Sequence, residues 1–516
     1  MRTVLVFLLT SLLVILVIPG GVAHAGVSNE DGPTEPWTWP ERIPQYNTPL
    51  YAPLLVADAN GVAHAFNLEA TGGTNYSILH RSWSIRQGWS APVDVLLPEY
   101  LGLAPMLMSV YLDGEGIIHL VYFASSQTDG DMFYSQAPAE NADRAGAWSE
   151  PVPIGKNAAG VAAAALGGNT VGELVMLYGG SREGLGLYAV NSLDGGSTWS
   201  APARIWQSPT EQIWPSSISV TADDTGQFHA VWGTANTLGQ GSEITYAALA
   251  PDLATTEHTT SLARQAAPED AVGAASILAS GDRLIVVYQD KFPPTKMMRM
   301  SDDGGLSWSM PARPFPHVGG YGDAAMVEDS LGKVHMVLGN RFPIPETHGM
   351  WYSLLEGSQW TPLEPIISGP RTDSFDPCCP QAVVCNGNVL LATWPHNVTQ
   401  ENLTGAWFAY RVLEAPPIRE TSELDATTSA AALVTPEATA ELTPTPEASA
   451  TPTPLASDDS AGVTQHEAES NPGIPVYLGV IPVVVLMVAA LFRRVRPASP
   501  KVPEGSRGES PEDPRE

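Results

Sequence analysis

The sequence is short of cysteine and of basic residues, and each shortage excludes a class of protein. Only Cys378, Cys379 and Cys385 occur among 516 residues, so at most one intramolecular disulfide can form and an odd thiol remains. A strand from Cys379 to Cys385 would hold its ends roughly 20 Å apart, too far for a disulfide between them. Lysine and arginine number 25 against 55 aspartate and glutamate. This excludes nucleic acid as a partner, because phosphate binding needs a basic surface.

Both ends of the chain carry apolar runs that are typical of targeting and membrane segments. Residues 1–25 combine Arg2, an apolar run and a small-residue end, which predicts a secretory signal peptide cleaved after Ala25. An uncleaved N-terminal anchor is the alternative. Residues 474–492 carry no charge and are followed at once by Arg493 and Arg494, a pattern typical of one transmembrane helix with its basic flank in the cytoplasm.

Residues 416–473, which precede this span, are rich in Thr, Pro, Ala, Ser and Glu and have almost no aromatic side chains. Such a segment cannot bury enough apolar surface to fold, so we expect a disordered stalk. Residues 493–516 would form a short cytoplasmic tail. The sequence therefore predicts a single-pass protein of the cell membrane whose N-terminal ectodomain, residues 26–415, lies outside the cell.

Two stretches of the ectodomain share the spacing S-x-D-x-G-x-[ST]-W. Their matching residues are Ser192, Asp194, Gly196 and Trp199 in one, and Ser301, Asp303, Gly305 and Trp308 in the other. The aspartate can accept backbone N–H groups of its own turn, and the glycine takes a positive φ without a Cβ penalty. We therefore expect hairpin turns. The tryptophan opens the next strand and can pack on the neighbouring sheet, burying roughly 150–250 Å².

This spacing resembles the Asp-box, or bacterial neuraminidase repeat, of sialidase-like β-propellers, in which such turns join the third and fourth strands of a blade. The resemblance implies that residues 26–415 form one all-β propeller of four-stranded blades. It is specific for architecture rather than for activity.

A second repeat, D-x-x-G-x-x-H, precedes these hairpins. Its histidines are His64, His119, His229 and His335. Apolar residues flank each copy, so we expect two antiparallel strands joined by a tight turn, the first and second of a blade. Placed once per blade, the histidines could not converge on one ion, and we expect each to pack inside its own blade. We predict no metal and no cofactor.

A third repeat, W-[ST]-x-P, sets the number of blades. Its copies lie about 50 residues apart, the period of a four-stranded blade, with one double gap that hides a degenerate copy near 252–262. They predict seven outer strands, near residues 37, 89, 148, 199, 255, 308 and 360. The last three strands, near 381–412, lack a fourth, so we expect the strand near Trp37 to complete the C-terminal blade and close the ring. A six-bladed ring with one hairpin as an insertion is the alternative.

The resemblance places a site on the face opposite the Asp-boxes, formed by the loops between second and third strands and between blades. It implies three arginines that grip a substrate carboxylate, a tyrosine nucleophile supported by a glutamate, and an aspartic acid as acid/base. Planar guanidinium groups hold a carboxylate bidentately, and a neutral tyrosine attacks an anionic sugar with less repulsion than a carboxylate would.

The loops expected on that face supply candidates for each role. The candidates for substrate binding are Arg182, Arg341, Arg371, Lys291 and Trp214. The candidates for catalysis are Tyr321 as nucleophile, with Asp323 close by in the sequence and Glu346 across the loop. The family's N-terminal signature, an aromatic residue followed by Arg-Ile-Pro, is matched only by Arg42-Ile43-Pro44 after Glu41, which we interpret as the tail of the closing strand.

Two functions fit these observations. The first is a surface-tethered exo-α-sialidase-like glycoside hydrolase acting on glycans or glycoproteins, which requires three arginines and a tyrosine to converge. The second is a non-catalytic propeller that binds glycan or protein. The fold cannot decide between them, because function belongs to the site and not to the scaffold.

Overall fold

The structure is a computed structural model. It describes residues 36–48, 50–72, 75–98, 104–125, 130–158, 163–236, 239–250, 256–267, 271–290, 295–316, 318, 324–341, 347–396 and 405–419, all within one compact unit. The predicted signal peptide, transmembrane span and cytoplasmic tail lie outside these residues, as does nearly all of the stalk. Among the described residues, no helix has the length and apolar character needed to span a bilayer.

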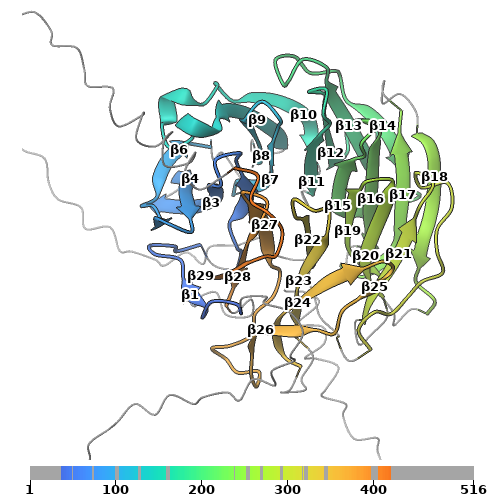
Figure 1. Ribbon diagram of the computed structural model, residues 1–516. Helices are drawn as coiled ribbons and strands as arrows, with labels where there is room; N and C mark the ends of the chain where they lie inside the picture. Colours follow the sequence, from blue (N-terminus) through green and yellow to red (C-terminus); the bar gives the residue numbers. More distant parts are fainter. Residues whose placement is uncertain are drawn as a thin grey trace, which may run out of the picture. The chain divides into compact units, whose positions relative to one another are not determined.

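The described chain folds into antiparallel β-sheets, shown in Figure 1, with only two short 3₁₀ turns, Ala139–Asn141 and Ala145–Ala147. Blade 1 contains β2 (Leu54–Ala57), β3 (Ala63–Gly72), β4 (Asn75–Ser84), β5 (Gly88–Trp89) and β6 (Val93–Leu96). Blade 2 contains β7 (Met106–Leu112), β8 (Ile117–Ser125), β9 (Gly130–Pro138) and β10 (Val152–Ala158). Blade 3 contains β11 (Ala164–Gly168), β12 (Leu174–Gly180), β13 (Gly186–Ser192) and β14 (Ala203–Gln207).

The remaining blades follow the same order. Blade 4 contains β15 (Ile213–Ala222), β16 (Phe228–Asn236), β17 (Gly241–Leu249) and β18 (Thr256–Arg264). Blade 5 contains β19 (Gly273–Ser280), β20 (Arg283–Asp290) and β21 (Thr295–Ser301), and a bridge between Met298 and Ala312 replaces its fourth strand. Blade 6 contains β22 (Ala324–Glu328), β23 (Val334–Asn340), β24 (Gly349–Glu356), β25 (Gln359–Trp360) and β26 (Glu364–Ser368). Blade 7 contains β27 (Gln381–Cys385), β28 (Val389–Pro395), β29 (Ala406–Val412) and β1 (Glu41–Arg42).

The innermost strands form a closed ring of seven. Each contacts the next, in the order β2, β7, β11, β15, β19, β22, β27 and back to β2. The N-terminal strand β1 pairs with β29, so the N-terminal strands in blue and the C-terminal strands in orange meet in Figure 1. Seven blades and closure by the N-terminal strand are therefore confirmed, and the six-bladed alternative is wrong. The paired residues, Glu41–Arg42, lie just after the predicted Trp37–Pro40.

The D-x-x-G segments form the tight turns between first and second strands. In blade 1, one carboxylate oxygen of Asp58 accepts the backbone N–H groups of Asn60 and Val62, both at 2.8 Å. Gly61 takes a φ of +77°, a conformation that costs a glycine nothing. These turns, together with those at 194–198 and 303–307 between third and fourth strands, lie at one end of the strands and form what we call the turn face. The opposite end, with its longer connections, is the loop face.

The four repeated histidines are buried within their own blades, as predicted. In blade 2, His119 bonds Asp113 of its own turn at 3.1 Å and the Tyr134 hydroxyl of the third strand at 2.7 Å. The same arrangement recurs around His229 and His335. In blade 1 a second histidine, His80, takes the place of the tyrosine.

The two S-x-D-x-G turns connect blade 3 with blade 2 and blade 5 with blade 4. Ser192 Oγ accepts the Gly196 N–H at 2.8 Å and donates to Asp194, whose carboxylate accepts the Thr198 N–H at 2.8 Å. Trp199 then packs edge-on against Tyr134 of blade 2, with ring centroids 4.9 Å apart.

The second turn repeats these bonds closely. Ser301, Asp303 and Gly305 make the equivalent contacts, and Trp308 packs on Tyr246 of blade 4 with the same 4.9 Å separation. The turn fixes the hairpin, and the indole binds it to the neighbouring blade.

Candidate functional site

Half of the predicted site residues fall in parts of the chain that the structure does not describe. The four outside the described residues are Lys291, Tyr321, Asp323 and Glu346. Their roles as substrate-binding and catalytic residues stay predictions. The four that are described, Arg182, Trp214, Arg341 and Arg371, all lie at the loop face.

Arg182 and Trp214 lie in blades away from the other two. Arg182 is exposed in the turn between β12 and β13 of blade 3, where it bridges to Gly184. Trp214 is half-buried at the start of β15, the innermost strand of blade 4, opposite Ala235. Arg341 and Arg371 belong to blade 6 and to the segment that leads into blade 7. The ring therefore separates the predicted arginine triad into a pair and a distant third member.

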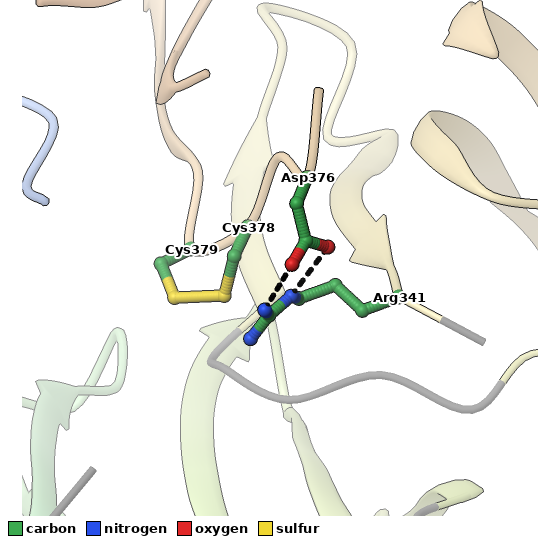
Figure 2. The surroundings of a disulfide bond; sticks show 4 residues. All are labelled: Arg341, Asp376, Cys378 and Cys379. Carbon is green, nitrogen blue, oxygen red and sulfur yellow. Dashed lines mark hydrogen bonds and ion pairs between the residues drawn. A yellow bond between two sulfur atoms is a disulfide. The ribbon is translucent and has the colours of Figure 1, made fainter. Parts of the chain in front are cut away.

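Arg341 and Arg371 meet on a carboxylate. Arg341 follows β23 directly and is 5 % exposed, and its guanidinium binds Asp376 with two parallel N–H donors, Nε to Oδ1 at 2.9 Å and Nη2 to Oδ2 (Figure 2). Arg371 Nη2 lies 2.7 Å from the same Oδ2, and its side chain stays 44 % exposed. Two guanidinium groups therefore share one buried carboxylate, and one of them reaches solvent.

His348, which directly precedes β24, completes the group. Its Nδ1 donates to the Gly369 carbonyl at 2.9 Å, and its Nε2 lies 3.2 Å from Asp376 Oδ1. His348 therefore links the carboxylate of Asp376 to the backbone at Gly369. We call Arg341, His348, Arg371 and Asp376 the carboxylate cluster, and its cations outnumber its single anion.

The Asp376 carboxyl group is held ionised. Burial by itself would raise its pKa, but hydrogen bonds from Arg341 and His348 and the charges of Arg341 and Arg371 hold that pKa well below its usual range. Asp376 therefore has no proton to give near neutral pH. It can anchor and orient the arginines, and it cannot act as a general acid there.

Aromatic rings line the blade 7 side of the cluster. Phe375 packs edge-on against His348, with centroids 5.3 Å apart, and contacts His396 at 5.1 Å. His396 in turn stacks on Trp407 at 4.5 Å. Burial lowers the pKa of His396, and its buried Nδ1 has no hydrogen-bond partner among the described residues. Phe375, His396 and Trp407 are all half-buried, so part of this wall is accessible.

Sequence reasoning missed most of this arrangement. The sequence analysis assigned no role to Asp376, His348, His396, Phe375 or Trp407. Their position was the available signal, because His348 directly precedes β24 and His396 directly follows β28, where strands end on the loop face.

The cysteines form one disulfide and leave one free thiol, as the sequence predicts. Cys378 and Cys379 form a disulfide between adjacent residues, beside the Arg341–Asp376 pair in Figure 2. Cys385 is left as a buried free thiol, whose pKa burial raises to about 12. Within the described ranges, no group of three or more His, Cys, Asp or Glu side chains could hold a metal ion.

Comparison with known proteins gives likeness in structure alone. No protein-family model matches the chain, and no curated protein matches it. A protein of unknown function from Dyadobacter fermentans is 12 % identical, over 73 % of this chain and 99 % of its own, with a TM-score of 0.43. A polysaccharide lyase described as a PL25 ulvan lyase is 11 % identical, over 75 % and 99 % of the two chains, with a TM-score of 0.47.

The NanB sialidase from Streptococcus pneumoniae is also similar. It is 10 % identical, over 74 % of this chain and 71 % of its own, with a TM-score of 0.40. At such identities and TM-scores, none of these likenesses supports a conclusion about function.

Proposed function

We propose that this protein is a cell-surface, sialidase-like propeller that recognises acidic sugars of glycans at the loop face of blades 6 and 7. The observation that carries the proposal is the carboxylate cluster. Arg371 is ion-paired on one side to the buried Asp376 and is 44 % exposed on the other. A guanidinium fixed in this way can bind a sugar carboxylate with little loss of side-chain freedom.

The charges of the cluster favour an anionic ligand. Arg341 and Arg371 together outweigh Asp376, in a chain whose net charge is −30. The half-buried Trp407 and Phe375 offer apolar surface of the kind on which a sugar ring can lie. Charge and aromatic surface side by side are the combination that an acidic sugar requires.

Hydrolysis is the finer form of this proposal. An exo-α-sialidase would use Tyr321 as nucleophile, together with Asp323, Glu346 and the arginines of the cluster. One observation favours the non-catalytic alternative. Asp376 occupies two N–H donors of Arg341, so these donors are not available to a sugar carboxylate.

The experiment that tests the proposal measures binding and turnover on the same protein. The full-length chain is titrated with sialyllactose and with a glucuronate disaccharide, and is assayed with a fluorogenic sialoside. Arg371→Ala should weaken binding by roughly 10- to 100-fold, the value of a hydrogen bond to a charged group.

Arg264→Ala is the matched control. Arg264 is exposed at 72 % and paired with Glu243 at 2.9 Å, at the end of β18 in blade 4. The Arg264→Ala substitution should leave the affinity for both acidic sugars unchanged. Loss of turnover in Tyr321→Phe would establish hydrolysis, and binding without turnover would establish the alternative. No binding of either acidic sugar by a folded sample would refute the proposal.

The surface location is part of the same proposal. The last described residues run along the turn face, where Leu413 N–H donates to Asn388 O at 2.7 Å and Ile418 N–H donates to Asn386 O at 2.9 Å. A stalk that continues from Arg419 would start at that face. The loop face would then point away from the membrane, toward glycans outside the cell, and protease release of the propeller from intact cells would test this location.

A further inference from the structure

The disulfide between Cys378 and Cys379 lies in the segment that holds the carboxylate cluster. Asp376 precedes Cys378 by two residues, and β27, the innermost strand of blade 7, begins two residues after Cys379. Figure 2 shows the disulfide beside the Arg341–Asp376 pair. The same short turn therefore carries both the bond and the carboxylate on which the arginines depend.

This disulfide can contribute little to global stability. In the chain-entropy description, a disulfide stabilises a protein by restricting the unfolded chain, and its effect grows with the length of the loop that it closes. Adjacent cysteines close the shortest loop possible. The bond must therefore act locally, on the backbone of the turn itself.

Local packing shows what the bond constrains. Cys379 has a φ of +52°, in the left-handed region that non-glycine residues rarely adopt. Cys378 is 1 % exposed, and its Cα is 3.0 Å from the point that a Cβ on Gly339 would occupy. Gly339 lies on β23, two residues before Arg341. The disulfide thus keeps a strained turn pressed against the strand that leads to the cluster.

We propose that the Cys378–Cys379 disulfide is a redox-sensitive positioning element of the acidic-sugar site, released by a dithiol reductant. This rests on the proposed function of the site. The reductant's thiolate attacks Sγ of Cys379, which is partly exposed, and the electron pair of the S–S bond passes to Sγ of Cys378. The second thiol of the reductant then displaces Cys379. Two electrons and two protons are transferred, the cysteines become thiols and the reductant becomes a disulfide.

Release of the turn would act through Asp376. Once Cys379 is free to leave the left-handed conformation, the adjoining segment no longer holds Asp376 rigidly between Arg341, His348 and Arg371. Arg371 then loses its fixed partner and must be ordered by the ligand, which lowers affinity. The oxidised protein is the binding-competent form, as suits the oxidising space outside a cell.

The test compares the full-length protein before and after treatment with dithiothreitol, with thiol alkylation and mass measurement to verify reduction. Hydrogen exchange is followed in peptides that cover 369–380, with β13 (Gly186–Ser192) as an internal reference. Sialyllactose and glucuronate disaccharide affinities are measured on the same samples. Reduction should speed exchange at 369–380 and not at β13, and should weaken binding roughly 10- to 100-fold.

Two variants sharpen the test. The double variant Cys378→Ala/Cys379→Ala should resemble the reduced protein and show no response to dithiothreitol. Cys385→Ala, which removes the buried thiol of β27, should keep the full response. Unchanged exchange in verified reduced protein would overturn the inference, and so would faster exchange with unchanged affinity. If the oxidised protein binds neither acidic sugar, the proposed function fails, while exchange at 369–380 still reports whether the disulfide holds the turn.

Discussion

The turn face is built by repetition, whereas the loop face of blades 6 and 7 is built once. Around His119, His229 and His335 the same aspartate and tyrosine contacts recur within a few tenths of an ångström. The carboxylate cluster has no counterpart among the other described blades. Residues whose contacts recur from blade to blade hold the blades together. Residues whose contacts occur once have a role other than stabilising the ring.

The two faces also differ in how their charges are satisfied. On the turn face, the repeated aspartates of the D-x-x-G and S-x-D-x-G turns accept backbone N–H groups of their own turns, so these bonds are local. Asp376 instead binds side chains of blade 6 and of the segment that leads into blade 7, with Arg341 35 residues away along the chain. The loop face therefore depends on long-range contacts that one substitution can remove.

The largest effect is expected at Asp376. Its replacement by alanine leaves the buried guanidinium of Arg341 without its carboxylate, which should lower the free energy of unfolding by about 3–5 kcal/mol. Asp302→Ala is the control, because this partner of Arg283 is 74 % exposed and should cost less than about 1 kcal/mol. Urea unfolding of both variants measures the difference, and equal losses would contradict the contrast between buried and exposed pairs.

A smaller effect is expected in blade 1, where the repeated histidine, His64, pairs with a second histidine, His80. In three blades the third strand carries a tyrosine diagonally opposite the repeated histidine: Tyr134, Tyr246 or Tyr352. In blade 1, His80 occupies the equivalent position. Burial, and then the charges of His64 and Arg81, lower the pKa of His80 from 6.5 to about 3.

Because the folded state resists protonation of His80, its contribution to stability is complete above pH 6.5 and is lost as the pH falls from 6.5 toward 3. The slope is roughly 1.4 kcal/mol per pH unit. His80→Tyr would restore the tyrosine of the other blades and remove this slope. Chemical unfolding of both proteins at pH 7, 6 and 5 measures it, and parallel curves would show that His80 does not control acid sensitivity.

The third prediction uses two adjacent glycines of the turn face. A Cβ on Gly196, at φ +88°, would lie 1.8 Å from the Tyr134 hydroxyl, whereas a Cβ on Gly195, at φ +64°, meets nothing within 4 Å. Both alanine variants suffer the left-handed backbone penalty of roughly 1 kcal/mol. Gly196→Ala should cost about 1–3 kcal/mol more, because Tyr134 must also move. The difference between the melting temperatures of the two variants measures how much the packing of this turn against Tyr134 of blade 2 contributes to stability. Equal melting temperatures would show that it contributes nothing.

The sequence predicted the turn face well because its signals are local and periodic. Asp194, Gly196 and Trp199 lie within a few residues of one another and recur at Asp303 to Trp308, and the copies of W-[ST]-x-P made the period measurable. Seven blades and the closing strand followed from counting. Blade 5 was the exception, because the strand expected near Trp308 is reduced to the bridge at Ala312.

The arrangement of the loop face could not be predicted in the same way, for a physical reason. Arg341 and Arg371 were recognised as guanidinium groups on suitable loops, but nothing local indicates that Asp376 binds both or that His348 joins them. These contacts depend on how blades 6 and 7 pack side by side. Arg182, chosen on the same grounds, lies three blades from blade 6, which only the closed ring reveals.

The smallest effect is expected where the loop face carries an ordinary exposed ion pair. Lys156 Nζ lies 3.0 Å from Asp131 Oδ2 at the loop face of blade 2, with side chains 46 % and 28 % exposed. Lys156→Ala should change the free energy of unfolding by less than about 1 kcal/mol, because solvent screens the attraction and the side chains lose freedom when they pair. Unfolding in low and high salt measures this, and the difference between variant and wild type should shrink as salt rises. A salt-independent loss as large as that of Asp376→Ala would mean that position in the fold, rather than burial of the charges, decides what an ion pair contributes.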